Sequence, residues 1–486
     1  MLGDEFGSEN VVPISNLNVF KLKSLVRDAS RFYDVPIEEV NAALRGVEKD
    51  VVTAVRKMGD DKNLFVLTFD DAMKHSKQFK EFIVKYPEIG TCIKVLFKQF
   101  KSLGRHAGGV IISERIGERM PLIAARGEMQ TPWVEGMNYK TLDPLGWTKF
   151  DLLGLDTLRM VPRAVRLILQ NRGGIKDPTF KQVQAWIDGN LMPETNDFDD
   201  QKVYEYVYHQ GHFAGVFQLT SPGSRRLFLK ARPRSIVDIA ALTSIYRPGP
   251  LAAHVDRIYL ENREHPESID YGHPLIKEVL ASSYNCIIFQ EQTMSLAHKV
   301  GGFPLEKTDS VRKAILKRSG ADPEASMRKA KAMKEAFVQG AMNNGVDEKL
   351  AGDLWEKVIF FSGYGFNAPH AISYAIDSYW CAYLHTHFEP EWLCAYMESQ
   401  IGNPDSRARA ISEIKACGWS IDTVDINHST DSWSIDYDRK ALVPSFGTFK
   451  AVGDVAVSEV LQMRPYHGIK DLLYDEKGGW KHSKFN

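Results

Sequence analysis

Apolar residues recur at helical spacing near the N-terminus of the chain. Six of them follow this period: Val19, Leu22, Leu25, Val26, Ala29 and Phe32. The spacing predicts an amphipathic helix over residues 18–33. Pro36 then favours the start of a second helix, which we expect to end near Gly46. Further helical patterns cover residues 71–86 and 92–102.

The pattern changes at residue 104. The segment GRHAGGVIISE predicts a glycine-rich turn followed by a β-strand over residues 110–113, and WTKFDLLGL predicts a second strand at residues 147–153. From residue 156 onward the pattern is mostly helix and loop, and residues 446–463 predict a hairpin at Gly453 followed by a helix. The predicted fold class is α+β and mostly helical.

Length and composition limit the class of protein. A chain of 486 residues, 44% hydrophobic and 25% charged, is typical of a globular protein with about three domains. The formal net charge of -1 excludes a strongly basic nucleic-acid binder at whole-chain level, although not local basic patches. Five scattered cysteines without a C-x-x-C pair argue against a disulfide framework or a cysteine zinc site. No long apolar run predicts a membrane span, so we expect a soluble, cytoplasmic protein.

The first candidate for chemistry is the strand that contains Lys149 and Asp151. Strand side chains alternate, so these two share one face, while Phe150 and Leu152 share the other and are expected to pack into a core. A carboxylate beside an ammonium group suits metal-assisted phosphoryl chemistry, in which aspartate holds Mg²⁺ and lysine contacts phosphate. An ion pair on a solvated strand face explains the same pattern and is favoured by the pattern alone.

Two basic segments are candidates for phosphate contacts. In GRHAGG, glycines permit close approach of a ligand and Arg105 and His106 add donors, although a tight turn is the simpler interpretation. Residues 306–334 carry a local net charge of +5, and their cations are Lys307, Arg312, Lys313, Lys317, Arg318, Arg328, Lys329, Lys331 and Lys334. Such a cationic face suits a triphosphate or a nucleic-acid backbone, and a solvated helix explains it equally well.

Aromatic residues gather in SGYGFNAPHAISYAIDSYW, residues 362–380. Phe366, Tyr374 and Tyr379 surround the polar residues Asn367 and His370. Aromatic side chains beside small residues can stack a base, and a buried aromatic core is the competing interpretation. Just after this segment, the His-x-His pair at residues 385 and 387 has no third ligand nearby in the sequence, which favours a structural role over metal binding.

Seven segments, taken in order, resemble the catalytic alpha subunit of the bacterial and phage replicative DNA polymerase III, the C family. They are RHAGGVIIS, TKFDLLGLDTL, GVFQL, IYRPGPL, IIFQEQTM, DSVRKAILKR and GYGFNAPHAISYA, between residues 104 and 375. The resemblance covers nearly the whole chain but only the middle of such a polymerase. It implies a partial nucleotidyltransferase palm, similar to that of polymerase beta, in residues 1–12 and 104–155. It also implies a helical thumb in residues 13–103, helical fingers in 156–440 and the start of a helix-hairpin-helix DNA-binding module in 441–486.

The resemblance also implies roles for individual residues. Asp151 matches the third catalytic carboxylate, a ligand of Mg²⁺, and Lys149 matches the phosphate-contacting lysine beside it. The residues that would bind the incoming deoxynucleoside triphosphate are Arg247, Arg312, Lys313, Tyr364, Asn367 and His370. The basic segments add residues expected to contact DNA or phosphate, namely Arg105, His106, Lys317 and Arg318.

The sequence departs from the family pattern in ways that affect the expected activity. The family supplies two of its three metal carboxylates from an Asp-x-Asp strand, and no such strand precedes residue 13 here. The dipeptide Ala368-Pro369 replaces the Lys-Ser that the family usually has. The tripeptide Ile-Leu-Lys, which begins at Ile315, replaces the Met-Gly-Lys of the family.

We therefore expect a split or interrupted, phage-like polymerase. It would extend a primer on template DNA in the cytoplasm of a bacterial host. A second polypeptide would supply the other half of the palm and share Mg²⁺ with Asp151. The chain alone is expected to be inactive. The alternative is a non-catalytic DNA- or nucleotide-binding remnant of such a polymerase.

Overall fold

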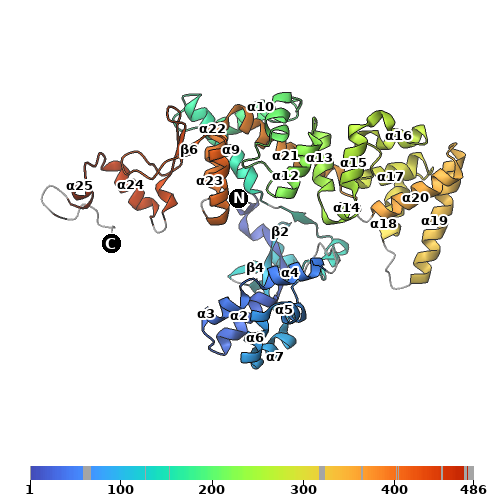
Figure 1. The fold of residues 1–486 in the computed structure, drawn as a ribbon, viewed down its shortest axis with the longest axis horizontal. Helices are drawn as coiled ribbons and strands as arrows, with labels where there is room; N and C mark the ends of the chain where they lie inside the picture. Colours follow the sequence, from blue (N-terminus) through green and yellow to red (C-terminus); the bar gives the residue numbers. More distant parts are fainter. Residues whose placement is uncertain are drawn as a thin grey trace. The chain divides into compact units, whose positions relative to one another are not determined.

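The computed structural model describes residues 2–57, 67–125, 127–152, 154–316, 323–362, 365–400, 402, 404–449, 452–474 and 479. The chain divides into two compact units, Met1–Gly154 and Leu155–Asn486 (Figure 1). Helices dominate and strands are few, in agreement with the predicted α+β class. The polymerase beta-like palm and the finer domain boundaries stay predictions.

The first unit contains a three-stranded sheet with strand order β1-β2-β5. Strands β1 (Val11–Val19) and β5 (Lys149–Asp151) both pair antiparallel with the central strand β2 (Phe100–Ile112). A short hairpin of β3 (Ile123–Ala125) and β4 (Glu128–Gln130) follows β2 in the sequence. One face of the sheet packs on a small core formed by Val12, Ile14, Ile111, Ile116, Met120 and Leu142.

Between β1 and β2 the chain forms a group of helices with its own core. These are α2 (Leu22–Phe32), α3 (Ile37–Leu44), α4 (Val47–Lys57), α5 (Phe69–His75), α6 (Lys77–Lys85) and α7 (Pro87–Leu96). The short elements outside this group are α1 (Leu2–Phe6), η1 (Ser8–Asn10), α8 (Ile116–Arg119), η2 (Tyr139–Thr141) and η3 (Asp143–Leu145). The apolar stripe of α2 buries Leu22, Leu25, Val26 and Ala29, as its period predicts.

Several predictions for this unit were wrong in detail. The first helix begins at Leu22, because the residues before it extend β1 up to Val19. The helix predicted over residues 92–102 ends at Leu96, and β2 has begun by Phe100. The glycine-rich segment 104–109, predicted as a turn before a strand, lies inside β2: Gly104 pairs with Asn16 of β1, and the register with β1 shifts between Arg105 and Val110. Pairing with a distant strand overrides the local turn signal of the glycines.

The second unit is mainly helical. Its helices are α9 (Asp156–Asn171), α10 (Phe180–Asn190), α11 (Gln201–Val203), α12 (Pro222–Ala231), α13 (Ile236–Ile245), α14 (Pro248–Ala252), α15 (Val255–Glu264), α16 (Pro274–Leu280), α17 (Gln290–Lys299), α18 (Leu305–Leu316), α19 (Pro323–Asn343), α20 (Glu348–Ser362), α21 (Ala368–His387), α22 (Glu389–Ser399) and α23 (Pro404–Ala416). The short helical turns are η4 (Tyr204–His209), η5 (Pro266–Ser268) and η6 (Ala281–Ser283). Helix α21 packs against α13 and α9 and carries the fully buried Tyr379 into the largest core.

A small sheet follows α23, with β8 (Ala441–Val443) between β6 (Ser420–Ile421) and β7 (Ser434–Asp436). After it come η7 (Phe446–Thr448), α24 (Asp454–Gln462) and α25 (Ile469–Leu473). The helix predicted after Gly453 is confirmed, but the described residues before it contain the turn η7 instead of a hairpin. None of the helices in the described ranges is long and apolar enough to cross a membrane.

One acid of α21 is expected to destabilise the fold at neutral pH. Burial raises the pKa of Asp377 from 3.8 to about 6. A raised pKa means that the folded state favours the protonated acid, so folding loses stability as the pH rises from about 4 through 6. Asp377→Asn should therefore stabilise the protein by about 1 kcal/mol at pH 7.5. This stabilisation is smaller than the full pKa shift would give, because solvent screens the charge of a partly buried side chain.

Urea unfolding curves at several pH values test this expectation. The gain from Asp377→Asn should shrink as the pH falls from 7.5 towards 4, because the native carboxyl is then protonated in the folded state. Asp353→Asn, at an exposed position of α20, is the matched control and should change little. A gain of equal size at both pH values would show that ionisation of Asp377 is not its cause.

Candidate functional site

In the first unit, the ammonium group of Lys149 lies between two carboxylates. Its Nζ is 2.7 Å from Oε2 of Glu135 and 2.9 Å from Oδ1 of Asp151, and it lies 4.9 Å from the centre of the Tyr139 ring. Only 13% of the Lys149 side chain is exposed, against 58% for Asp151. Burial tends to lower the pKa of Lys149, but the hydrogen bonds to the two carboxylates outweigh it and leave the pKa raised. The lysine is therefore a fixed positive charge beside an exposed carboxylate.

The faces of strand β5 are only partly as predicted. The ion pair confirms that Lys149 and Asp151 share a face. Lys149 pairs with the buried Ile111 of β2, so this same face carries the core of the sheet. The expectation that Phe150 and Leu152 pack into a core was wrong, because they lie on the opposite face and are 45% and 49% exposed.

The glycine at position 109 explains how two side chains fit beside each other on this face. Gly109 pairs with Asp151 across the sheet. A Cβ at this position would lie 2.8 Å from Nδ1 of His106 and 2.8 Å from Cε of Lys149. At such distances a Cβ would force His106 or Lys149 to shift, so the missing side chain lets these two residues occupy their present neighbouring positions.

Nδ1 of His106 accepts the backbone N–H groups of Gly108 and Gly109, at 3.2 and 2.5 Å. Since Nδ1 is an acceptor, Nε2 is the nitrogen that carries the proton. The other basic residue of this segment, Arg105, is exposed and pairs with Glu128 at 3.2 Å. Phosphate contacts by Arg105 and His106 stay predictions.

In the second unit, distant segments of the sequence meet around Phe366. The backbone N–H of Phe366 donates to Ile288 at 2.9 Å, and the N–H of Gln290 donates to Phe366 at 2.8 Å. The guanidinium carbon of Arg247 lies 4.7 Å from the centre of the Phe366 ring. The segments IYRPGPL, IIFQEQTM and GYGFNAPHAISYA, which are far apart in the sequence, therefore form one site.

Asn367 is the N-cap residue of helix α21, and both the oxygen and the nitrogen of its side-chain amide form hydrogen bonds. Its Oδ1 accepts the N–H of His370 at 3.0 Å, which is the usual N-cap bond, and its Nδ2 donates to Oε1 of Glu291 at 3.0 Å. Oε2 of Glu291 accepts the N–H of Ala368 at 2.8 Å. A structural role thus accounts for Asn367, and nucleotide binding by this residue stays a prediction.

Four aromatic rings form a row that begins at Phe366. Ring centres lie 5.3 Å apart for Phe366 and His370, 4.1 Å for His370 and Tyr374, and 5.0 Å for Tyr374 and Phe217. His370 is exposed, and His370 and Tyr374, four residues apart on α21, lie on one side of the helix. We call these four residues the aromatic row. The exposed ring of His370, beside three half-buried rings, offers a surface on which a base can stack.

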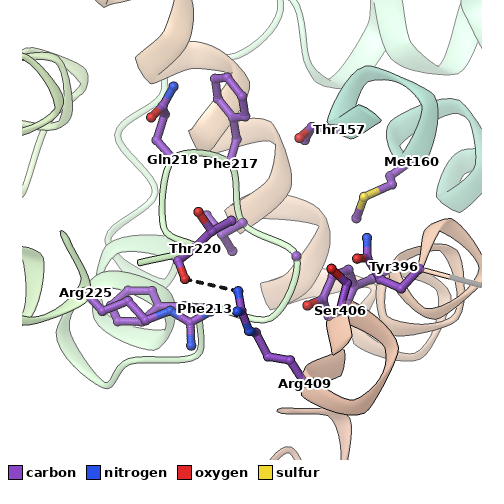
Figure 2. A pocket seen from close by; sticks show the side chains of 13 residues that line it. Thr157, Met160, Phe213, Phe217, Gln218, Thr220, Arg225, Tyr396, Ser406 and Arg409 are labelled. Carbon is purple, nitrogen blue, oxygen red and sulfur yellow. Dashed lines mark hydrogen bonds between the residues drawn. The ribbon is translucent and has the colours of Figure 1, made fainter. Parts of the chain in front are cut away.

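The segment GVFQL, which supplies Phe217, also lines a cavity of about 430 Å³ (Figure 2). Gly215 and Gln218 both have positive φ angles, 72° and 65°, which bend the segment around the cavity. A Cβ at Gly215 would lie 2.9 Å from the ring of Tyr396, so a glycine is needed there. Arg409 also lines this cavity, and its Nη1 donates to the carbonyl of Thr220 at 3.4 Å (Figure 2).

Several predicted residues cannot be compared with these two sites. Arg312 and Lys313 lie in α18, but their side chains are outside the described part of the structure, and so are the whole residues Tyr364, Lys317 and Arg318. Sequence reasoning missed two acids, Glu135 and Glu291. Glu135 lies in a segment without a local signal, and Glu291 lies in IIFQEQTM, one of the polymerase-like segments, which does not indicate its partner. Only the fold brings each acid to its partner.

Two family models match the chain. Residues 1–154 match the bacterial DNA polymerase III alpha NTPase domain, and residues 158–345 match the bacterial DNA polymerase III alpha subunit finger domain. Curated relatives named DNA polymerase III subunit alpha include those of Campylobacter jejuni, 30% identical over 475 residues, and Aquifex aeolicus, 29% identical over 500 residues. The alignments cover 96% and 98% of this chain but 36% and 40% of those relatives, so the chain spans well under half of their length.

Proposed function

Since both models and the relatives describe one subunit, the chain belongs to the bacterial DNA polymerase III alpha subunit family, and we propose that it takes part in template-directed DNA synthesis. The proposed reaction is the addition of deoxynucleotides from their triphosphates to the 3′ end of a primer. The observation that carries this proposal is the exposed carboxylate of Asp151, fixed beside the charged Lys149 on a short strand.

The donor set around Asp151 suits Mg²⁺ but does not complete a site for it. An exposed carboxylate oxygen is a ligand that Mg²⁺ prefers, and the bound ion would neutralise charge on the phosphoryl oxygens. Two-metal phosphoryl transfer needs several carboxylates. Within the described ranges, Asp151 is not part of any group of three potential metal ligands with atoms within 4.8 Å of one another. We propose that a second polypeptide supplies the remaining carboxylates.

Lys149 has a separate role in this proposal. Its ammonium is held by Glu135 and Asp151 and cannot leave the strand face without breaking both contacts. A fixed charge is already oriented before the reaction, so it stabilises negative charge that develops on a transferring phosphoryl group. Lys149 would thus orient Asp151 and offset phosphate charge at the same point.

The aromatic row and Arg247 are the proposed contacts for the nucleotide. The exposed ring of His370 can stack a base, and Arg247 over Phe366 keeps a cation at the edge of the row. Arg312 and Lys313 remain proposed contacts for the triphosphate. Primer-template DNA, deoxynucleoside triphosphates and a cytoplasmic location are likewise proposals, and so is a phage-type, split organisation.

Primer extension with Mg²⁺ and the four deoxynucleotides tests the proposal. The chain would be assayed alone and together with a polypeptide that carries the Asp-x-Asp palm strand of the family. We expect extension only in the mixture. Extension by the chain alone would contradict the need for a second polypeptide. Inactivity in both tubes, with primer-template binding retained in a fluorescence anisotropy assay, would instead support the non-catalytic DNA-binding alternative.

A further inference from the structure

The second unit contains a group of three side chains of the kinds that bind transition metals, of which His385 is buried and the other two are partly buried. His385 belongs to the last turn of α21, Glu389 is the first residue of α22, and Cys417 follows α23. Nε2 of His385 lies 3.8 Å from Sγ of Cys417 and 3.9 Å from Oε1 of Glu389. All three potential ligand atoms lie within 4.8 Å of one another. None of the seven polymerase-like segments contains these residues.

The imidazole of His385 is poorly satisfied without an additional ligand. The side chain is fully buried, and its Nδ1 has no hydrogen-bond partner among the described residues. Its Nε2 forms a long hydrogen bond with Sγ of Cys417 at 3.8 Å and lies 3.9 Å from Oε1 of Glu389, beyond the 2.7–3.2 Å of a typical N–H···O hydrogen bond. A buried Nδ1 without a partner is uncommon in folded proteins, and the other ring nitrogen has only the long contact with the sulfur.

The separations suit a tetrahedral metal ion. Zinc binds nitrogen, oxygen and sulfur at about 2.0–2.3 Å, which puts neighbouring tetrahedral ligand atoms roughly 3.3–3.6 Å apart. The observed 3.8 and 3.9 Å exceed this by a few tenths of an ångström, which small side-chain rotations can remove.

The carboxylate of Glu389 is already oriented by two donors. The hydroxyl of Tyr206 donates to its Oε1, and Nε1 of Trp419 donates to its Oε2 at 3.0 Å. Metal-binding carboxylates are typically held by such outer contacts. An oxygen that accepts one hydrogen bond keeps a second lone pair, so Oε1 can still bind a metal.

We propose that His385, Glu389 and Cys417 bind one Zn²⁺ ion, with water as the fourth ligand. One thiolate, one imidazole and one carboxylate favour a borderline-soft ion such as Zn²⁺ over Mg²⁺ or Ca²⁺. The thiol of Cys417 loses its proton to solvent on binding. The two anionic ligands then balance the charge of the ion, which suits a buried position. The ion would tie the corner between α21 and α22 to the end of α23.

The sequence pattern favoured a structural role for the histidines at residues 385 and 387 over metal binding, and the proposed site does not use them as a pair. In the pair at residues 385 and 387, only the first histidine belongs to the group, because Nε2 of His387 contacts Oδ2 of Asp200 at 2.8 Å. On a strand, the two histidines of a His-x-His pair face the same way and can bind one ion. Residues 385 and 387 lie on a helix, where their side chains point in different directions. The partners of His385 come instead from positions 389 and 417.

Cobalt binding to the full 486-residue chain tests the proposal. After removal of metals with a chelator, titration with Co²⁺ should give one equivalent of binding. The absorption spectrum should show visible bands of tetrahedral cobalt and a near-ultraviolet thiolate-to-cobalt band. Cys417→Ser should lose the thiolate band. The matched control is Cys394→Ala, which removes another buried cysteine outside the group and should keep the spectrum.

A second measurement does not depend on the folding of a variant. X-ray absorption at the zinc edge of the wild-type protein loaded with one equivalent of Zn²⁺ should show one sulfur at about 2.3 Å and three nitrogen or oxygen ligands. A shell without sulfur, or the absence of stoichiometric binding, would overturn the proposal. A thiolate band that persists in folded Cys417→Ser would also overturn it.

Discussion

Asp151→Asn is expected to lower the rate of primer extension by the assembled polymerase about a thousandfold. The substitution keeps the size of the side chain but removes the charge that the proposed Mg²⁺ needs. A loss of about 4 kcal/mol of transition-state stabilisation corresponds to this factor, and it is within the several kcal/mol that a catalytic metal ion supplies. Single-turnover kinetics with saturating nucleotide would measure it, because the effect should fall on the chemical step.

The neighbouring carboxylate provides the sharpest comparison. Glu135→Gln removes the other partner of Lys149 but leaves Asp151 and its contact with the lysine in place. We expect a loss of no more than about tenfold, the size of an effect on orientation alone. Asp143→Asn, at an exposed position of the same unit, should leave the rate unchanged. Equal losses for Glu135→Gln and Asp151→Asn would assign the effect to the position of Lys149 rather than to a metal ligand.

Local sequence patterns predicted the parts of the fold that depend on local interactions. The apolar stripe of α2 and the helix after Pro36 were predictable, because residues three and four positions apart meet on a helix. The alternation around Phe150 predicted the strand and the shared face of Lys149 and Asp151. It did not predict which face is buried, since that depends on Ile111 of another strand.

The contacts that complete each site are long-range. Glu135 reaches Lys149 from the loop after β4, and Glu291 reaches the start of α21 from a helix 76 positions earlier. Although Glu291 lies in the polymerase-like segment IIFQEQTM, no local pattern identifies the partner of either acid. The glycine-rich segment illustrates the same limit, because its turn-like composition instead serves the close approach of His106 and Lys149 inside a strand.

Arg172→Ala is expected to destabilise the protein by about 3 kcal/mol. The carboxylate of Glu391 is fully buried and binds Arg172 through two hydrogen bonds, Nε to Oε1 at 2.7 Å and Nη2 to Oε2 at 2.9 Å. Without the guanidinium, the hydroxyl of Tyr437, which donates to Oε1 at 2.8 Å, is the remaining side-chain hydrogen-bond partner of this anion among the described residues. The loss should lie at the lower end of the range for buried pairs, because 45% of the arginine side chain is exposed and water can partly replace it.

Urea unfolding of Arg172→Ala, Glu391→Gln and the double variant would separate the ion pair from the burial of the acid. Glu391→Gln should cost less than Arg172→Ala, because an uncharged amide leaves no buried anion behind. Lys334→Ala, which breaks the exposed pair with Glu356, is the control and should cost less than about 1 kcal/mol. If Arg172→Ala costs no more than this control, water must reach Glu391. The pair that joins the end of α9 to α22 would then act as a surface contact despite the buried carboxylate.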